Sequence, residues 1–238
     1  MSLFVPPRRF DPYVPEIMDR RGNDAALLRA DLRVLDYINR FLGGHRIALG
    51  YLDELLDTAP MNPVRILDLA TGGADVPRAI ARWARRKRIG VEITAMDRNP
   101  EILTLARERC AGWPEIRIEQ HDLLALPYAA ASFDVVTCSL TLHHFTRANV
   151  VAILRRIHDI TRVGYIINDL RRNRVAIGLT KLMARTIIRN PIAQFDAPAS
   201  CERAFSVAEL RAMAARAELR SFVIRRHRYF RVAIAGRK

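Results

Sequence analysis

The chain has 238 residues, enough for one large folding unit, and half of them are hydrophobic. No stretch approaches the roughly 18 uninterrupted apolar residues of a membrane span, which excludes a transmembrane protein. The net charge of +14 comes from 39 Lys and Arg against 25 Asp and Glu, but the basic residues are dispersed and not interleaved with aromatic ones, which disfavours a nucleic-acid partner.

Two helices are predicted before the first strand. Apolar residues recur at steps of three and four from Pro15 to Phe41, which is the helical period. A second helix is predicted from about His45 to Leu56, after the Gly43-Gly44 break. We expect residues 1–62 to form an N-terminal helical lid or extension, and residues 63–238 to form the core of the same folding unit.

After this extension, short apolar runs alternate with helical segments, which is typical of a parallel sheet covered by helices. The last two strands are separated by only a few residues, so they must pair antiparallel. The predicted fold is α/β: a Rossmann-like, doubly wound sheet of seven strands, mostly parallel, with a C-terminal antiparallel hairpin and N-terminal helices. Strands are predicted at 64–69, 91–96, 116–119, 133–139, 163–168, 219–226 and 229–235, and helices at 76–86, 100–110, 148–160, 175–188 and 206–217.

The segment from Asp68 to Asp75 reads Asp-Leu-Ala-Thr-Gly-Gly-Ala-Asp and follows the first predicted strand. Its small residues, among them two glycines able to take a positive φ, let a nucleoside lie against the main chain. Asp97 ends the next predicted strand, where a carboxylate can accept both hydroxyls of a ribose. Nicotinamide-dependent reductases share this arrangement, but two loop carboxylates would repel a pyrophosphate and suit a cationic amino-acid ligand.

Residues 68–75 resemble motif I of class I S-adenosylmethionine-dependent methyltransferases, in the variant of ubiquinone and menaquinone methyltransferases. Ala74 stands where glycine is commoner. The resemblance continues through Asp97, Asp122 and residues 132–136, and it covers residues 64–170. It implies S-adenosylmethionine as the cofactor and S-adenosylhomocysteine as the product. The implied cofactor-binding residues are Asp68, Ala70, Thr71, Gly72, Asp97, Arg98, Asp122, Leu123, Ser139 and Leu140.

The acceptor end is predicted from the segment Ser139 to Phe145, which is similar to that of many small-molecule methyltransferases. It lacks the Asn or Asp, the two prolines and the aromatic residue of nucleic-acid N-methyltransferases. Histidine can remove a phenolic proton near neutral pH, so His143 and His144 are the catalytic candidates, unless they only pack beside the cofactor. Asp169 and Arg171 follow the fifth strand and are expected to bind the substrate.

These features predict a methyltransferase of small-molecule metabolism, and O-methylation of a phenolic or polyketide-type secondary metabolite is the first expectation. C-methylation of a quinone precursor is the runner-up. Three less favoured functions stay open: RNA methylation, a nicotinamide-dependent reductase and a nucleoside-binding fold without turnover. We expect a helix near residues 173–190 to cover the acceptor, and its basic face could contact a membrane surface.

The three cysteines, Cys110, Cys138 and Cys201, have no spacing typical of a zinc site or a disulfide framework, so no metal is expected. The first ten residues contain two prolines and two arginines and no apolar core, unlike a secretory signal. The expectation is therefore a cytoplasmic protein with reduced thiols. Its oligomeric state stays open between a monomer and a homodimer.

Overall fold

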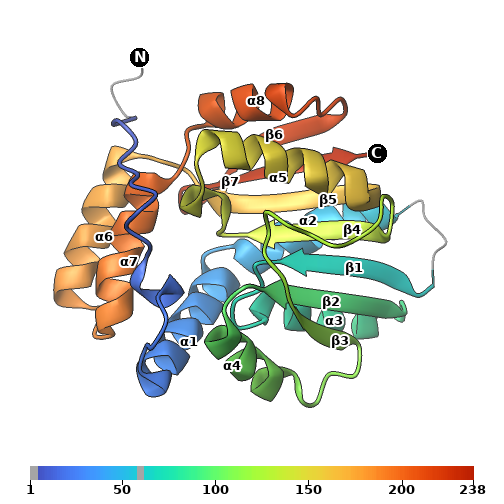
Figure 1. The fold of residues 1–238 in the computed structure, drawn as a ribbon, viewed down its shortest axis with the longest axis horizontal. Coiled ribbons are helices and arrows are strands. Elements are labelled where there is room, and N and C mark those ends of the chain that lie inside the picture. Colours follow the sequence, from blue (N-terminus) through green and yellow to red (C-terminus); the bar gives the residue numbers. More distant parts are fainter. Residues whose placement is uncertain (1–4, 58–61) are drawn as a thin grey trace.

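The computed structural model describes residues 5–57 and 62–238. Seven strands form one sheet in the order β3-β2-β1-β4-β5-β7-β6 (Figure 1). Neighbouring strands are parallel except β5 with β7 and β7 with β6, which are antiparallel, so the predicted fold class is confirmed. The strands are β1 (Val64–Leu69), β2 (Val91–Asp97), β3 (Ile116–Gln120), β4 (Phe133–Ser139), β5 (Thr161–Leu170), β6 (Phe222–His227) and β7 (Arg231–Arg237).

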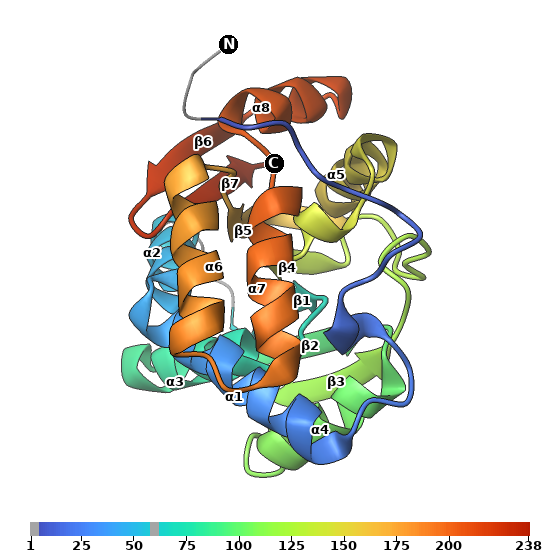
Figure 2. The same cartoon turned by 90° about the vertical axis from the view of Figure 1, so that its left-hand side faces the viewer.

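Helices cover both faces of the sheet, and others lie beyond the carboxyl ends of its parallel strands (Figures 1 and 2). The α-helices are α1 (Ala25–Phe41), α2 (Gly44–Leu56), α3 (Asp75–Lys87), α4 (Pro100–Cys110), α5 (Arg147–Ile160), α6 (Arg174–Thr186), α7 (Pro191–Arg203) and α8 (Val207–Arg216). Two short 3-10 helices are η1 (Ile17–Asp19) and η2 (Leu142–His144). None of the helices in the described part of the chain has both the length and the apolar character needed to cross a membrane.

The central strand β1 is buried on both faces, which explains its nearly continuous apolar sequence. Leu67 and Leu69 pack in one core cluster with residues of α5 and α8, whereas Ile66 packs in another with residues of α2 and α3. All three side chains are 0% exposed, and burying each one contributes about 1.5–3 kcal/mol. The two clusters hold β1 and its following loop in a fixed position.

One predicted helix was wrong, and one observed helix had not been predicted. The helix expected from Pro15 to Phe41 is interrupted, because Gly22 takes a φ of +76° and the Asp24 side chain caps a new helix by accepting from the amides of Ala26 and Leu27. Helix α7 was not predicted at all, since its apolar residues follow no clear helical period and it contains Pro198. Its start has a recognisable signal, in which Asn190 caps the helix and Pro191 occupies its first turn.

Helices α6 and α7 lie side by side beyond the carboxyl ends of the parallel strands, with α1 next to them (Figure 2). Helix α7 contacts both 3-10 helices, and so it connects the N-terminal segment to the loop after β4. Arg8 strengthens this connection by donating to the backbone carbonyls of His143 and Phe145 at 3.0 and 2.9 Å. Open α/β folds bind ligands at the carboxyl ends of their parallel strands. In this protein, helices and the N-terminal segment cover those strand ends.

Candidate functional site

A cavity of about 540 Å³ lies at these covered strand ends. The loop after β1 lines one part of it and the loop after β4 lines another, while residues 10–19 and helix α6 contribute further walls. Its volume is in the range of small-molecule sites, about 300–1,000 Å³. The cavity includes every predicted cofactor-binding residue except Asp68, and it also includes His143, His144 and Arg171.

The loop after β1 bends sharply around small residues. Ala70, Gly72 and Ala74 have φ values of +51°, +53° and +55°, in the left-handed region. For the two alanines this conformation costs roughly 1–2 kcal/mol each. Gly73, predicted to be able to take a positive φ, is not among the residues that do so. Its small size matters instead, because a Cβ there would lie 2.5 Å from the Arg109 guanidinium.

Asp97 ends β2 directly beside this loop. Its Oδ2 accepts a hydrogen bond from the Gly72 amide at 3.0 Å, and its Oδ1 accepts one from the Asn99 amide at 3.0 Å. Burial raises the pKa of Asp97, and the two amides partly oppose that rise. The helix that follows is capped by Asn99 and not by Asp97, which leaves the second lone pairs of the carboxylate available to a ligand in the cavity.

Asp68 lies behind the loop and not on the cavity wall. It is 2% exposed and accepts hydrogen bonds from the hydroxyls of Thr71 at 2.7 Å and Thr137 at 2.6 Å. Burial raises the pKa of Asp68 to about 7, although both hydroxyls favour the carboxylate. The geometry therefore gives Asp68 a role in positioning the loop, while Asp75 lines the cavity and accepts from Asn39 at 2.9 Å.

The remaining predicted cofactor residues approach the cavity from the neighbouring loops. Asp122 is exposed and accepts from the Leu124 amide at 2.8 Å, so it both shapes a turn and faces the cavity. Leu140 follows β4 with a φ of +53°, another strained position beside the site. Arg98, Leu123 and Ser139 also line the cavity. The structure therefore assembles these residues from the ends of three strands.

Two histidines on η2 also line the cavity, and carboxylates orient them. The Nδ1 atom of His143 lies 2.6 Å from Asp169 Oδ1, and the Nδ1 atom of His144 lies 3.0 Å from Asp19 Oδ2. Burial would lower the pKa of His144, but Glu16 and Asp19 raise it to about 9. Burial would raise the pKa of Asp169, but its contacts with His143 lower it overall. Asp169 thus acts through His143 and does not line the cavity.

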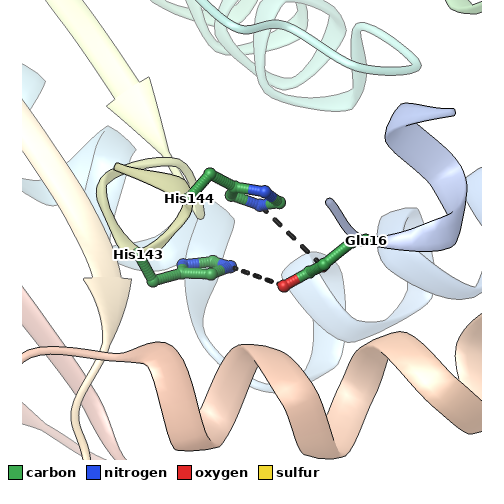
Figure 3. A group of neighbouring side chains, drawn as sticks. All are labelled: Glu16, His143 and His144. Atoms are coloured by element: carbon green, nitrogen blue, oxygen red, sulfur yellow. Dashed lines mark ion pairs between the residues drawn. The ribbon is translucent and has the colours of Figure 1, made fainter. Parts of the chain in front are cut away.

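Glu16 is the main residue that the sequence analysis missed. It comes from the N-terminal segment, is 2% exposed, and has carboxylate oxygens 3.9 Å from the Nε2 atoms of both His143 and His144 (Figure 3). Ser200 donates to Glu16 at 2.9 Å, and the Arg203 guanidinium lies 3.4 Å from it. No local pattern could reveal this contact, because more than one hundred residues separate Glu16 from the histidines.

Comparison with known proteins identifies a methyltransferase domain at residues 66–164. Over 85 residues the chain is 41% identical to demethylmenaquinone methyltransferase of Deinococcus radiodurans, and this match covers 35% of this chain and 34% of that protein. It is 32% identical over 120 residues to ubiquinone biosynthesis O-methyltransferase of Paracidovorax citrulli, covering 49% of this chain and 44% of the relative. The chain thus spans less than half the length of these relatives.

Solved structures share the fold at low sequence identity. An S-adenosylmethionine-dependent methyltransferase from Aquifex aeolicus matches 96% of this chain and 99% of its own, with a TM-score of 0.62 and 14% identity. Human N-acetylserotonin methyltransferase, solved with S-adenosylmethionine, matches 90% of this chain and 56% of its own, with a TM-score of 0.65 and 15% identity. These matches support the class I methyltransferase fold that the motifs indicated.

Proposed function

We propose that this chain, whose residues 66–164 form a class I methyltransferase domain, transfers a methyl group from S-adenosylmethionine to a small organic acceptor. The observation that carries the proposal is one continuous cavity. Asp97 and the strained loop at Gly72 line it together with the oriented imidazoles of His143 and His144.

The residues around Gly72 and Asp97 fit S-adenosylmethionine. The bend from Ala70 to Gly72 lacks large side chains, so an adenosine can approach the main chain, and Asp97 can accept from its ribose hydroxyls. Asp75 also faces the cavity, where a carboxylate favours a cationic cofactor and disfavours a pyrophosphate. This charge distribution supports the methyl donor over a nicotinamide cofactor. The bound group would supply an electrophilic methyl carbon next to a positive sulfur.

The chain's own contribution is to align the acceptor and to keep water away from it. Residues 10–19 and helix α6 form walls of the cavity, and apolar residues such as Leu179 and Met183 line it. Holding two reactants in a productive orientation removes much of the entropic cost of their encounter. His143 activates the accepting atom, because an oxygen nucleophile reacts faster once its proton is lost, and the positive charge favoured at His144 stabilises the resulting oxyanion.

The acceptor we favour is the oxygen of a phenolic or polyketide-type metabolite. Carbon methylation of a quinone precursor has equal support, since the relatives include both a demethylmenaquinone methyltransferase and a ubiquinone biosynthesis O-methyltransferase. The cavity suits either acceptor, because both are flat, mainly apolar rings with hydroxyl groups. A panel of phenols and hydroquinones therefore tests both reactions in one assay.

The experiment measures transfer of an isotope-labelled methyl group from S-adenosylmethionine to that panel, followed by mass analysis of the product. We expect His143→Gln to lower turnover by about 100-fold or more while leaving the affinity for S-adenosylhomocysteine unchanged. The control is His121→Gln, which removes a histidine that does not line the cavity. Binding of the cofactor without transfer to any acceptor would instead support a nucleoside-binding protein without turnover.

A further inference from the structure

Figure 3 shows an arrangement that acid–base chemistry alone does not require: both imidazoles turn their Nε2 atoms toward the same carboxylate, that of Glu16. Each Nδ1 atom faces a different carboxylate, Asp169 for His143 and Asp19 for His144. These outer contacts fix the orientation of each imidazole and leave Nε2 as the nitrogen that faces Glu16. Histidines that bind metals are usually oriented by an outer carboxylate in this way.

The Nε2 atoms have no hydrogen-bond partner within residues 5–57 and 62–238, although each lies 3.9 Å from a Glu16 oxygen. The His143 side chain is 3% exposed, and both histidines line the cavity. The two Nε2 atoms and the Glu16 carboxylate therefore face one common position at the cavity wall.

From this geometry we infer a binding site for a divalent transition-metal ion, with His143 Nε2, His144 Nε2 and a Glu16 oxygen as its ligands. On a tetrahedral zinc ion with bonds of about 2.0–2.1 Å, neighbouring ligand atoms are about 3.4 Å apart. The separations of 3.9 Å between Glu16 and each imidazole therefore need to shorten by only about 0.5 Å. Small side-chain rotations provide such a shift.

The charges around the site also suit a divalent cation. The carboxylates of Glu16, Asp19 and Asp169 lie around the histidines, while the guanidinium of Arg203 lies 3.4 Å from Glu16 and that of Arg98 lies 3.9 Å from Asp19. With the imidazoles counted as uncharged, one net negative charge remains, which favours a cation.

The ligand set indicates which ions the site would bind. Two imidazoles and one carboxylate suit borderline ions such as Zn²⁺, Co²⁺ and Fe²⁺ and are a poor match for Mg²⁺ or Ca²⁺, which prefer oxygen ligands. A second group, Asp36, His45 and Asp75, offers one imidazole and two carboxylates, and the Arg78 guanidinium is paired with Asp36 at 2.8 Å, closer than the 3.4 Å between Arg203 and Glu16.

The meaning of the ion for catalysis rests on the proposed function. Three protein ligands leave at least one coordination position open, and Glu16, His143 and His144 all line the cavity. An acceptor hydroxyl in that position would become more acidic through direct coordination. The histidines would then activate the acceptor by holding the metal ion, and the preferred acceptors would be those that offer an oxygen ligand.

The test is a titration of the metal-free protein with Co²⁺, followed by calorimetry and by the visible absorption of the bound ion. We expect one ion per chain, four- or five-coordinate absorption without a thiolate band, and no comparable binding of Mg²⁺. Glu16→Gln and His144→Gln should each weaken Co²⁺ binding by at least about tenfold. Far-UV circular dichroism shows whether each variant is folded.

Two control variants separate this site from other ligands. His121→Gln removes a histidine paired with Glu119 at 3.3 Å outside the cavity, and Cys201→Ser removes the thiol that lines it. Both should retain Co²⁺ binding. Wild-type protein that fails to bind Co²⁺, or ligand variants that bind it as tightly as wild type, would overturn the inference. Titration of the same samples with S-adenosylhomocysteine tests the cofactor end independently, so failure of one proposal is distinguishable from failure of the other.

Discussion

Replacing Asp97 by alanine tests the cofactor end of the cavity most directly. The carboxylate already accepts from the amides of Gly72 and Asn99, both at 3.0 Å, which holds its oxygens beside the bend of the loop. Two ribose hydroxyls would add two charge-assisted hydrogen bonds, each contributing about 1.5–3 kcal/mol. Asp97→Ala should therefore cost about 3 kcal/mol or more of binding free energy, which corresponds to an increase of at least about 100-fold in the Kd for S-adenosylhomocysteine.

Isothermal titration calorimetry with S-adenosylhomocysteine measures this change, because the product binds without being consumed. The matched control is Glu92→Ala, which removes an exposed acid near the start of the same strand, far from the cavity. Circular dichroism confirms that both variants are folded. If Asp97→Ala bound the product within about threefold of the wild-type affinity, a difference below 1 kcal/mol, the ribose would not lie at Asp97 and the placement of the cofactor would be refuted.

Two further predictions concern the loop after β1. The pKa of Asp68 rises from its ordinary 3.8 to about 7 on folding, so the folded state holds a proton that the unfolded chain releases. The free energy of unfolding of the wild-type protein should therefore fall relative to that of Asp68→Asn as the pH rises from about 4 to 7, by up to about 1.4 kcal/mol per pH unit. Urea unfolding at a series of pH values measures this difference, and a difference that does not change with pH would contradict the prediction. Ala74→Gly relieves a left-handed alanine but deletes a buried methyl group, so it should change stability by less than about 1 kcal/mol. Ala81→Gly, at an equally buried site inside α3, should cost about 2 kcal/mol in the same assay, and equal losses would exclude strain at Ala74.

The sheet and most of its helices could be predicted because their signals are local. Helix α4 was predicted with its observed bounds, since Pro100 marks its first turn and its apolar residues recur with the helical period. The antiparallel pairing of β6 and β7 followed from their short connection. The capping box of Ser206 and Glu209 formed as expected at the start of α8. In each case a few neighbouring residues determine the result.

The acceptor end could be predicted only in part, because it depends on contacts between distant segments. The sequence indicated His143 and His144, but not that Asp169 and Asp19 would orient them. Glu16 stands in a segment whose apolar spacing suggested a continuous helix, so its position opposite the histidines had no sequence signal. The segment's course depends on the turn at Gly22 and on α7, and neither was predicted.

The backbone strain near the cavity follows from the topology of the sheet. The chain adds β2 and β3 on one side of β1 and then crosses to add β4 on the other side, so the loops after β1 and β4 separate and leave a crevice between them. Ala70, Ala74 and Leu140, three residues with a left-handed φ despite having a Cβ, lie in these two loops. At roughly 1–2 kcal/mol each, their strain is comparable to the stabilisation from a few buried side chains of β1 and β4. The core therefore stabilises both loops in their bent form, so a bound ligand would not have to supply the free energy of bending them.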